Sequence, residues 1–518
     1  MASASLKRPL DILVIGAGVS GLSCARELLR RSPGISLSVL EANDRVGGRT
    51  LADSEGTDLG AGYIGPGQDH ILAIVEELGL KVTKVYTAGK TTQCLHDVVS
   101  YYQGLVPPIS PIGTIDLNTA MQEMERLVNL CDMNDPRKTP NAVELDRTTV
   151  QQAIEKLCWT SEARSVLRTA IRAIMCAEPC EVSTLGLLWY IKRSGGTRRI
   201  FETENGAQDS KVVGGYGIVA PMMAARLPAG TVRLNKPVRT IDSRDATTVT
   251  VTCSDGERFV ARTVVLAIAP VQQLRIEYLP ALPSGKMQAL QQFKMGHIIK
   301  TFTYYDTPFW REKKLNGSAV CDDGIVVVSM DDTKPDGTLP CIMGFVLTDQ
   351  ATKYATMSTA VMMEALGAHY AKLFKDERGR RPLRIKRKNW SEEPWVGGCY
   401  TSVPGPLCLT VHLTALEAPL AEGRILVAGT EVAKVNSGYV DGAVEAGERI
   451  ARNALVKLGQ LPSREYDVMI TPPPSKLLPL TPLEYTWIET HLPSMTSFIV
   501  AGAASLVGVA AFLVTRWW

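Results

Sequence analysis

The segment WVGGCYTSV, residues 395–403, places a thiol beside a phenol directly after two glycines. Glycine lets the backbone approach a neighbouring group closely, because it has no side chain. On such a turn Cys399 has two interpretations. It is a small buried hydrophobe, as cysteines most often are, or its sulfur is bonded to a large molecule that lies against the turn. In the second case Tyr400 would lie against the same molecule.

Lys300 is a second candidate for chemistry, within the segment MGHIIKTFTYY. Its apolar and aromatic neighbours predict a buried strand. A buried lysine needs a hydrogen-bonding partner or an ordered water, whereas a strand lysine that faces solvent needs neither. We expect Lys300 to be buried and to have a functional role.

The N-terminal segment DILVIGAGVSGLSCARELLRR carries Gly16, Gly18 and Gly21 in the pattern G-x-G-x-x-G. A short apolar run at 12–15 predicts a strand before these glycines, and apolar residues at helical spacing follow them. Such glycines permit a tight turn and let backbone N–H groups approach a pyrophosphate at the helix N-terminus. The next predicted strand ends in Glu41, twenty residues after Gly21, where a carboxylate accepts hydrogen bonds from ribose hydroxyls. Together these features predict dinucleotide binding.

Two later segments extend this prediction. DRVGGRT contains Gly47, Gly48 and Arg49, and an arginine fork suits a phosphate or an oxygen at the edge of a flavin; a surface turn is the alternative. Near the other end of the chain, GRILVAGTEVA predicts a strand and a glycine turn at 425–429, and a helix follows from about Tyr439 to Leu458. The N-terminus of that helix, aimed at a flavin, would stabilise negative charge on the ring. The cofactor domain is therefore expected to be discontinuous.

Composition fits a globular protein of two or more domains, since the chain has 518 residues, of which 45% are hydrophobic and 21% charged. A net charge of +3 gives no electrostatic footprint for nucleic acid. The basic stretch RGRRPLRIKRK, residues 378–388, is predicted to be a solvated loop and edge strand, with attraction to an anionic membrane as the alternative. Eleven cysteines without a disulfide-like rhythm, and no signal peptide, indicate reduced thiols.

The C-terminal segment differs in kind, because residues 492–515 carry no charge and include SFIVAGAASLVGVAAFLV. A helix needs about 20 apolar residues to cross a bilayer, and Arg516, Trp517 and Trp518 supply a cation and two interfacial aromatics. A buried core helix is the alternative. We expect a single-span anchor in membrane lipid at 492–518, with the N-terminal bulk facing the cytosol.

Several motifs, in this order, resemble those of the monoamine oxidases: DRVGGRT, CWT, LWYIK, DDTKPDG, GGCYT and SGYVDGAVEAGER. The resemblance runs along nearly the whole chain. It implies an α/β fold in which a Rossmann-like FAD-binding domain (1–81, 213–289 and 393–457) is interleaved with an α+β substrate domain (82–212, 290–392 and 458–491). It also implies a homodimer and an anchor in the mitochondrial outer membrane; the endoplasmic reticulum is the alternative destination.

The resemblance also implies roles for individual residues. Cys399 would carry FAD as an 8α-thioether, and Gly397 and Gly398 would let the backbone reach the ring edge. Tyr400 and Tyr439 would flank the substrate nitrogen, because electron-rich faces orient an amine without holding it as ammonium. Lys300 would hold a water beside the flavin. The remaining residues expected to bind FAD are Gly16, Gly18, Gly21, Glu41, Gly47, Gly48, Arg49, Val238, Gly429, Thr430, Glu431 and Val440; no metal is expected.

The substrate pocket is expected to be apolar. Its implied lining residues are Ala173, Ile174, Tyr190, Phe201, Gln208, Val328 and Phe345. Ala173 and Val328 are smaller than the residues that the family often has there, which predicts a single, less divided cavity. Tyr216, Asn436 and Val396 also depart from the family pattern, which leaves the substrate preference open.

The predicted reaction is the flavin-dependent oxidation of primary, and some secondary or tertiary, monoamines to aldehydes. O2 is the predicted acceptor, and the other products are hydrogen peroxide and ammonia or an amine. There are four alternatives. A polyamine or histone-demethylating oxidase generally needs acidic residues, an amino-acid oxidase needs an arginine for the substrate carboxylate, and a copper amine oxidase needs clustered histidines. The fourth alternative is a catalytically silent, membrane-tethered flavoprotein. Cys399, Tyr400, Tyr439 and Lys300 favour the monoamine oxidase.

Overall fold

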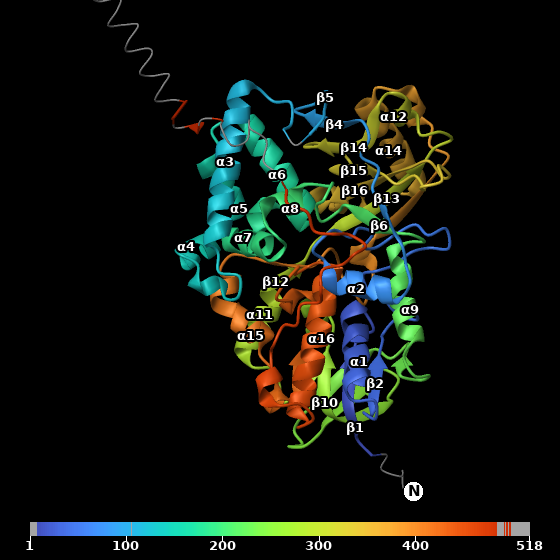
Figure 1. Cartoon of the computed structure of the whole chain (residues 1–518), viewed down its shortest axis with the longest axis vertical. Coiled ribbons are helices and arrows are strands. Elements are labelled where there is room, and N and C mark those ends of the chain that lie inside the picture. Colours follow the sequence, from blue (N-terminus) through green and yellow to red (C-terminus); the bar gives the residue numbers. More distant parts are fainter. Residues whose placement is uncertain (1–7, 105, 484–491, 493, 496, 499–518) are drawn as a thin grey trace, which may run out of the picture.

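An eight-stranded sheet, a seven-stranded sheet and a group of helices are the main parts of the molecule (Figure 1). The computed structural model describes residues 8–104, 106–483, 492, 494, 495, 497 and 498. In Figure 1 the eight-stranded sheet lies in the lower half, the seven-stranded sheet at the upper right and the helical group at the upper left.

The eight-stranded sheet is built around β1 (Leu10–Ile15). This strand is flanked on both sides by parallel strands, β2 (Leu37–Leu40) and β10 (Arg258–Leu266). A strand that is buried on both faces has a continuous run of apolar residues. Residues Ile12 to Val14 are fully buried, so the strand predicted at 12–15 is confirmed. The other strands are β7 (Val232–Arg233) and β19 (Ile425–Val427), which are also parallel, together with β8 (Val238–Asp242), β9 (Val249–Cys253) and β11 (Glu277–Leu279).

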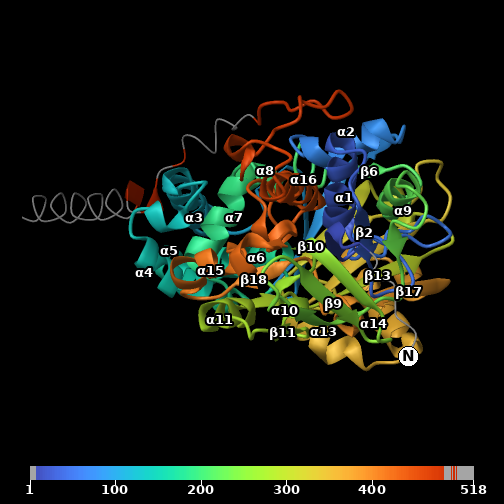
Figure 2. The ribbon, with the colours of Figure 1, turned by 90° about the horizontal axis from the view of Figure 1, so that it is seen from below.

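Two long helices lie side by side on this sheet, α1 (Val19–Arg31) and α16 (Val440–Lys457) (Figures 1 and 2). They meet at backbone distance, because a Cβ added to Gly447 would collide with the carbonyl oxygen of Ser20. The helix predicted near Tyr439 is therefore confirmed, with Tyr439 as the residue that precedes its first turn. Helix α2 (Asp69–Glu77) packs on α16, and α9 (Val219–Ala225) packs on α1. Helix α10 (Pro270–Gln273) follows β10 in the chain.

The seven-stranded sheet has the order β17-β13-β16-β15-β14-β4-β5. Its strand β13 (Ile298–Tyr304) is buried along its whole length, which confirms the buried strand predicted around Lys300. The other strands are β4 (Lys90–Leu95), β5 (Val98–Tyr102), β14 (Leu315–Cys321), β15 (Val328–Asp331), β16 (Cys341–Leu347) and β17 (Arg384–Asn389). The helices α12 (Phe309–Glu312), α13 (Thr348–Ala355) and α14 (Thr359–Phe374) belong to this part of the chain.

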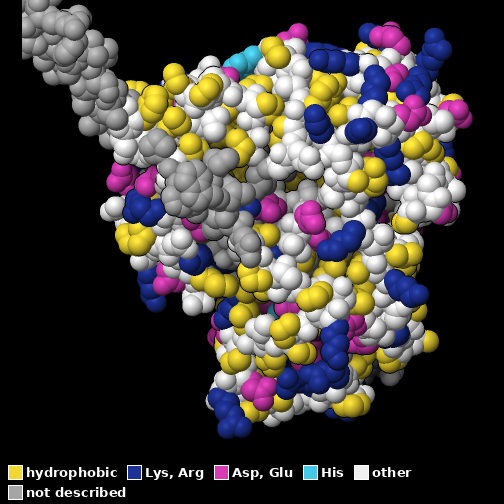
Figure 3. Space-filling model, turned by 45° about the horizontal axis from the view of Figure 1, so that its top comes forward, with side chains coloured by type: hydrophobic (Ala, Val, Ile, Leu, Met, Phe, Trp, Pro, Cys, Tyr) yellow, Lys and Arg dark blue, Asp and Glu magenta, His cyan; other side chains and the backbone are white. Residues whose placement is uncertain are grey.

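The basic stretch at 378–388 ends in β17, at one edge of this sheet. Several of its cations are paired with acids, among them Arg384 with Glu55 at 2.9 Å and Lys386 with Asp53 at 2.5 Å. Figure 3 shows basic and acidic side chains intermixed at the upper right of the molecule. The predicted loop and edge strand are confirmed.

The helical group contains α3 (Pro111–Leu130), α6 (Ser161–Met175) and α7 (Thr184–Arg193). Thr160 caps α6 by accepting a hydrogen bond from the N–H of Ala163. One end of α6 reaches the seven-stranded sheet, where Ser165 Oγ lies 3.0 Å from His96 Nε2. The remaining elements are α4 (Ala142–Arg147), α5 (Val150–Leu157), α8 (Thr197–Phe201), α11 (Ser284–Gln292), α15 (Leu413–Glu417), β3 (Val82–Lys84), β6 (Ser210–Val212), β12 (Phe293–Met295) and β18 (Ser402–Pro404).

Among the helices that the described residues form, none has both the length and the apolar character needed to span a bilayer. The anchor predicted at 492–518 lies almost wholly outside the described residues, which include nothing after residue 498.

Candidate active site

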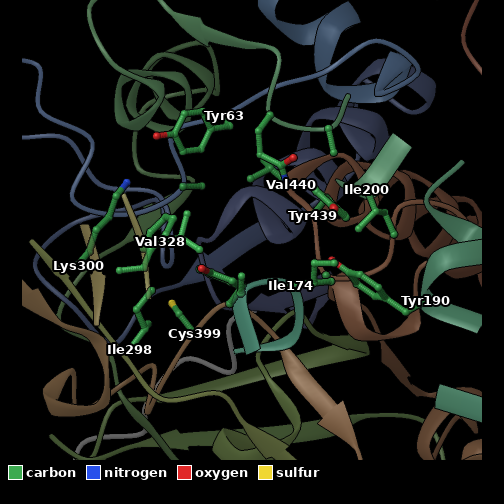
Figure 4. A pocket seen from close by; sticks show the side chains of 18 of the residues that line it. Tyr63, Ile174, Tyr190, Ile200, Ile298, Lys300, Val328, Cys399, Tyr439 and Val440 are labelled. Atoms are coloured by element: carbon green, nitrogen blue, oxygen red, sulfur yellow. The ribbon is translucent and has the colours of Figure 1, made fainter. Parts of the chain in front are cut away.

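One cavity of about 1180 Å³ is lined by residues from both large sheets and from α6 and α7. The residues predicted to bind cofactor or substrate all line this cavity, except Gly21 and Glu431. The structure therefore brings together segments that are several hundred residues apart in the sequence. Figure 4 shows Lys300 and Cys399 on one side of this cavity, and Tyr190 and Tyr439 on the opposite side.

The glycine turn after β1 forms one end of the cavity. Gly16 has φ +100°, and a Cβ there would lie 2.7 Å from the carbonyl oxygen of Ala267. Gly21 does not face the cavity; its missing side chain makes room for the carbonyl oxygen of Gly16. A Cβ on Gly18 would meet nothing within 4 Å, so the backbone is open toward the cavity there.

The polar groups at this end fit a dinucleotide. Glu41 accepts hydrogen bonds from the N–H groups of Ala17 at 2.8 Å and Asn43 at 2.9 Å, which fixes its carboxylate at the cavity wall. Ser20, in the first turn of α1, has a buried hydroxyl without a partner among the described residues. A buried hydroxyl at a helix N-terminus suits a phosphate oxygen. These residues could hold the pyrophosphate and ribose of such a cofactor.

Glu431 and Arg49 form a buried ion pair beside the cavity, with 2.7 Å between Arg49 Nη1 and Glu431 Oε1. Arg49 also donates to the carbonyl oxygen of Tyr400 at 3.1 Å, and Thr401 donates to Glu431 at 3.2 Å. Burial alone would raise the pKa of Glu431, but the Arg49 guanidinium holds that pKa below its usual value. The pair ties the loop at 47–49 to the Cys399 turn and to the turn after β19.

Cys399 lies at the cavity wall and is almost fully buried. Burial raises the pKa of its thiol to about 12, so the thiol is protonated at neutral pH. Gly398 is also needed for packing within the chain, because a Cβ on it would lie 2.5 Å from the carbonyl oxygen of Gly296. That carbonyl oxygen accepts a hydrogen bond from Cys399 N at 3.0 Å. The predicted approach of Gly397 and Gly398 to the edge of the flavin stays a prediction. The peptide bond from Cys399 to Tyr400 is cis.

Tyr400 and Tyr439 both line the cavity. Tyr439 stacks on Tyr190, with ring centroids 5.9 Å apart and planes 17° apart. Tyr400 meets Phe345 edge-on at 5.8 Å. Burial raises the pKa of Tyr400 and of Tyr439, so both rings are neutral phenols with electron-rich faces.

Lys300 is 4% exposed and donates to two carbonyl oxygens, those of Asp58 at 2.6 Å and Gly60 at 2.8 Å. Burial lowers the pKa of Lys300 to about 8, even though the Asp58 carboxylate opposes this shift. The rings of Tyr63 and Phe302 lie 5.9 and 5.3 Å from its nitrogen. Sequence reasoning missed the contacts of Lys300 with Asp58, Gly60 and Tyr63, and the glycine-rich run DLGAGY at 58–63 is the signal that could have located them.

The predicted substrate-lining residues come from several elements around one space. The cavity continues past Ala173 on α6 and Val328 on β15 as far as Gln93 on β4. Because the same cavity also includes the dinucleotide end, the single, less divided substrate space stays a prediction. Hydrogen bonds with Tyr190 and Gln208 oppose the rise that burial causes in the pKa of Tyr439. The full predicted set lines the cavity: Ala173, Ile174, Tyr190, Phe201, Gln208, Val328 and Phe345.

The sequence of the chain is similar to those of known flavin-containing enzymes. The sequence pattern of the family described as flavin containing amine oxidoreductase matches residues 19–455. Flavin-containing amine oxidase A of Canis lupus familiaris is 37% identical over 98% of this chain and 95% of its own length. Flavin-containing amine oxidase B of Mus musculus is 36% identical over 97% of this chain and 96% of its own length.

Solved structures show the same architecture. Wild-type putrescine oxidase bound to putrescine superposes with a TM-score of 0.82 at 27% identity, covering 87% of this chain and 99% of the other. Cyclohexylamine oxidase from Brevibacterium oxydans IH-35A superposes with a TM-score of 0.81 at 27% identity, covering 87% and 100%.

Proposed function

The chain belongs to the family of flavin containing amine oxidoreductases, and we propose that its substrates are monoamines. It is a flavin-dependent amine oxidase. The observation that carries the monoamine proposal is the neutral, aromatic lining of the cavity around Cys399, made by Tyr190, Tyr439, Tyr400 and Phe345. Electron-rich ring faces can orient an amine without the carboxylate that would hold it as ammonium.

The flavin, when bound, supplies the redox chemistry, because it accepts two electrons from the amine and O2 then takes them up as hydrogen peroxide. The chain supplies the rest. Tyr400 and Tyr439 present ring faces that orient the neutral amine. The apolar walls exclude water, which strengthens every electrostatic interaction inside. Lys300, fixed by two carbonyl oxygens, provides a positive charge or a held water at the wall near Cys399. The imine product is hydrolysed to an aldehyde.

We propose that the cofactor is FAD and that Cys399 holds it as a thioether. Two observations support this. The glycine turn and Glu41 line the same cavity as Cys399, so one extended dinucleotide could reach both. Arg49 and Glu431 fix the Cys399 turn to the dinucleotide-binding loops, which positions the sulfur. The other cofactor-binding roles at Val238, Gly429, Thr430 and Val440 rest on their place in the lining.

The test is peroxide production by the purified full-length protein with benzylamine, serotonin or spermine. Peroxide from benzylamine or serotonin is the expected result. Peroxide from spermine alone would replace the monoamine proposal with a polyamine oxidase. No peroxide from any of the three would favour a catalytically silent flavoprotein.

We also propose a division of the chain into two domains, a C-terminal membrane anchor and a homodimer. The strands of the eight-stranded sheet all fall within 1–81, 213–289 and 393–457, and those of the seven-stranded sheet within 82–212 and 290–392, which supports the division into FAD-binding and substrate domains. The uncharged segment at 492–515 supports a C-terminal anchor. Attachment to the mitochondrial outer membrane and homodimer formation follow the family resemblance.

A further inference from the structure

The seven-stranded sheet carries a row of side chains that leads away from the reaction site. Lys300 pairs in register with Phe345, Phe345 with Val328, Val328 with Val320, and Val320 with Gln93. All five line the cavity, so they share one face of the sheet. Neighbouring strands lie about 4.8 Å apart, which puts Gln93 about 19 Å from Lys300.

Helix α6 forms an opposite wall that runs the same way. Ala173, Ala170 and Val166 are spaced three and four residues apart, so they lie on one helix face, and all three line the cavity. The helix ends near the reaction site, where the N–H of His297 donates to the carbonyl oxygen of Cys176. Its other end reaches His96, just after β4. Small side chains on both walls keep this space open between the aromatic site and Gln93.

The far end of this space holds an unused polar group. Gln93 is 5% exposed, and within the described part of the chain its Oε1 has no hydrogen-bond partner. A buried amide oxygen left unpaired costs free energy unless a ligand or water satisfies it. Asp322 also lines the cavity, but its carboxylate is already bonded to the backbone N–H of His96.

We propose that Gln93 is the distal subsite of the active site, where it hydrogen-bonds a hydroxyl at the far end of an extended amine. The inference rests on the proposed amine oxidation and names its substrate class: long amines with an apolar body and a neutral polar end. A hydroxyl both donates and accepts, so it matches an amide in either orientation. Gln93 itself carries no charge that would offset the desolvation of a second ammonium, so the diamines in the test below decide whether the Asp322 carboxylate does so.

The test compares matched substrates on the same preparation of full-length enzyme. Alkylamines, amino alcohols and diamines of hexyl, octyl, decyl and dodecyl length are assayed for kcat/KM by peroxide formation. With the wild-type chain, the ratio of amino alcohol to alkylamine should rise with length. For the dodecyl compounds, Gln93→Leu should lower the ratio of kcat/KM for the amino alcohol to kcat/KM for the alkylamine by about 3- to 10-fold. Because both substrates meet the same enzyme, any loss of folded protein cancels in the ratio.

Thr92→Val is the matched control. Thr92 directly precedes Gln93 on β4 and is fully buried. Its hydroxyl also has no hydrogen-bond partner among the described residues, but Thr92 does not line the cavity. This variant should keep the wild-type ratio. A second variant, Val320→Phe, narrows the space before Gln93, and it should lower the ratio of dodecylamine to hexylamine.

Three results would overturn the assignment: an amino alcohol ratio that Gln93→Leu leaves unchanged, an equal effect of Thr92→Val, or a Gln93-dependent preference for the diamine. The last would make the subsite one for a cation. Failure of the proposed function is distinguishable, because then benzylamine would also yield no peroxide.

Discussion

At the scale of single residues, Cys399 is a buried, protonated thiol at the wall of a cavity that also contains a dinucleotide-binding turn. If it carries the flavin, Cys399→Ala should move the visible absorbance from the acid-precipitated polypeptide to the supernatant. Cys176→Ala is the control, because Cys176 is equally buried nearby but does not line the cavity; its colour should stay in the pellet. Colour retained by the Cys399→Ala pellet would show that another group is the tether.

Lys300 is a residue whose charge changes within the working range of pH. Its pKa is lowered to about 8, so the ammonium form is present below that pH and is lost as the pH rises through it. If the positive charge assists the reaction with O2, the rate of oxygen uptake by the pre-reduced enzyme should fall above about pH 8. Lys300→Met should lower that rate by about 10-fold or more below pH 8, as expected for the loss of a nearby charge, and should flatten the pH profile.

Stopped-flow measurement of that rate across pH gives the result, and the preceding step in which the amine reduces the enzyme provides an internal comparison. A Lys300→Met profile that still bends near pH 8 would assign the titration to another group. Asp58 is the nearest such group, and burial raises its pKa only to about 6, so the two bends would be separable.

At the scale of elements, the turn between β1 and α1 depends on Gly21. A methyl group there would collide with the carbonyl oxygen of Gly16, so Gly21→Ala should destabilise the protein by about 2 kcal/mol. Gly34→Ala is the matched control, because a Cβ at Gly34 meets nothing within 4 Å. Thermal unfolding with and without added FAD measures both variants. Equal stability of the two would show that the turn adapts to the extra atom.

Local patterns predicted the elements that carry the site, but not the contacts between them. The glycine turn at Gly16, the buried strand of Lys300 and the helix after Tyr439 follow from nearby residues, because apolar period and glycine spacing are local signals. The carbonyl partners of Lys300 lie some 240 residues earlier in the chain, and the pairing of Val320 with Gln93 joins equally distant strands. Such contacts depend on strand order and register, which no local pattern specifies.

At the scale of the whole molecule, the uncharged segment at 492–515 is expected to hold the enzyme on a membrane while the rest of the chain folds independently of it. A chain that ends at residue 491 should therefore remain in the supernatant after high-speed centrifugation and keep its peroxide-forming activity. The full chain should sediment with the membranes and resist extraction by high salt. Sedimentation of the shortened chain with membranes would place the attachment elsewhere on the molecule.

The pairing of β10 with both β1 and β19 constrains when the enzyme can be completed in the cell. On the ribosome, β1 and α1 emerge long before β19 and α16, so for most of translation the glycine turn has neither its covering helix nor the acid that fixes Arg49. A nascent chain therefore lacks the part of the cavity wall that is needed to retain a flavin. We therefore expect cofactor loading to be a late event in biogenesis, because the last wall of the site is encoded in the final fifth or so of the coding sequence.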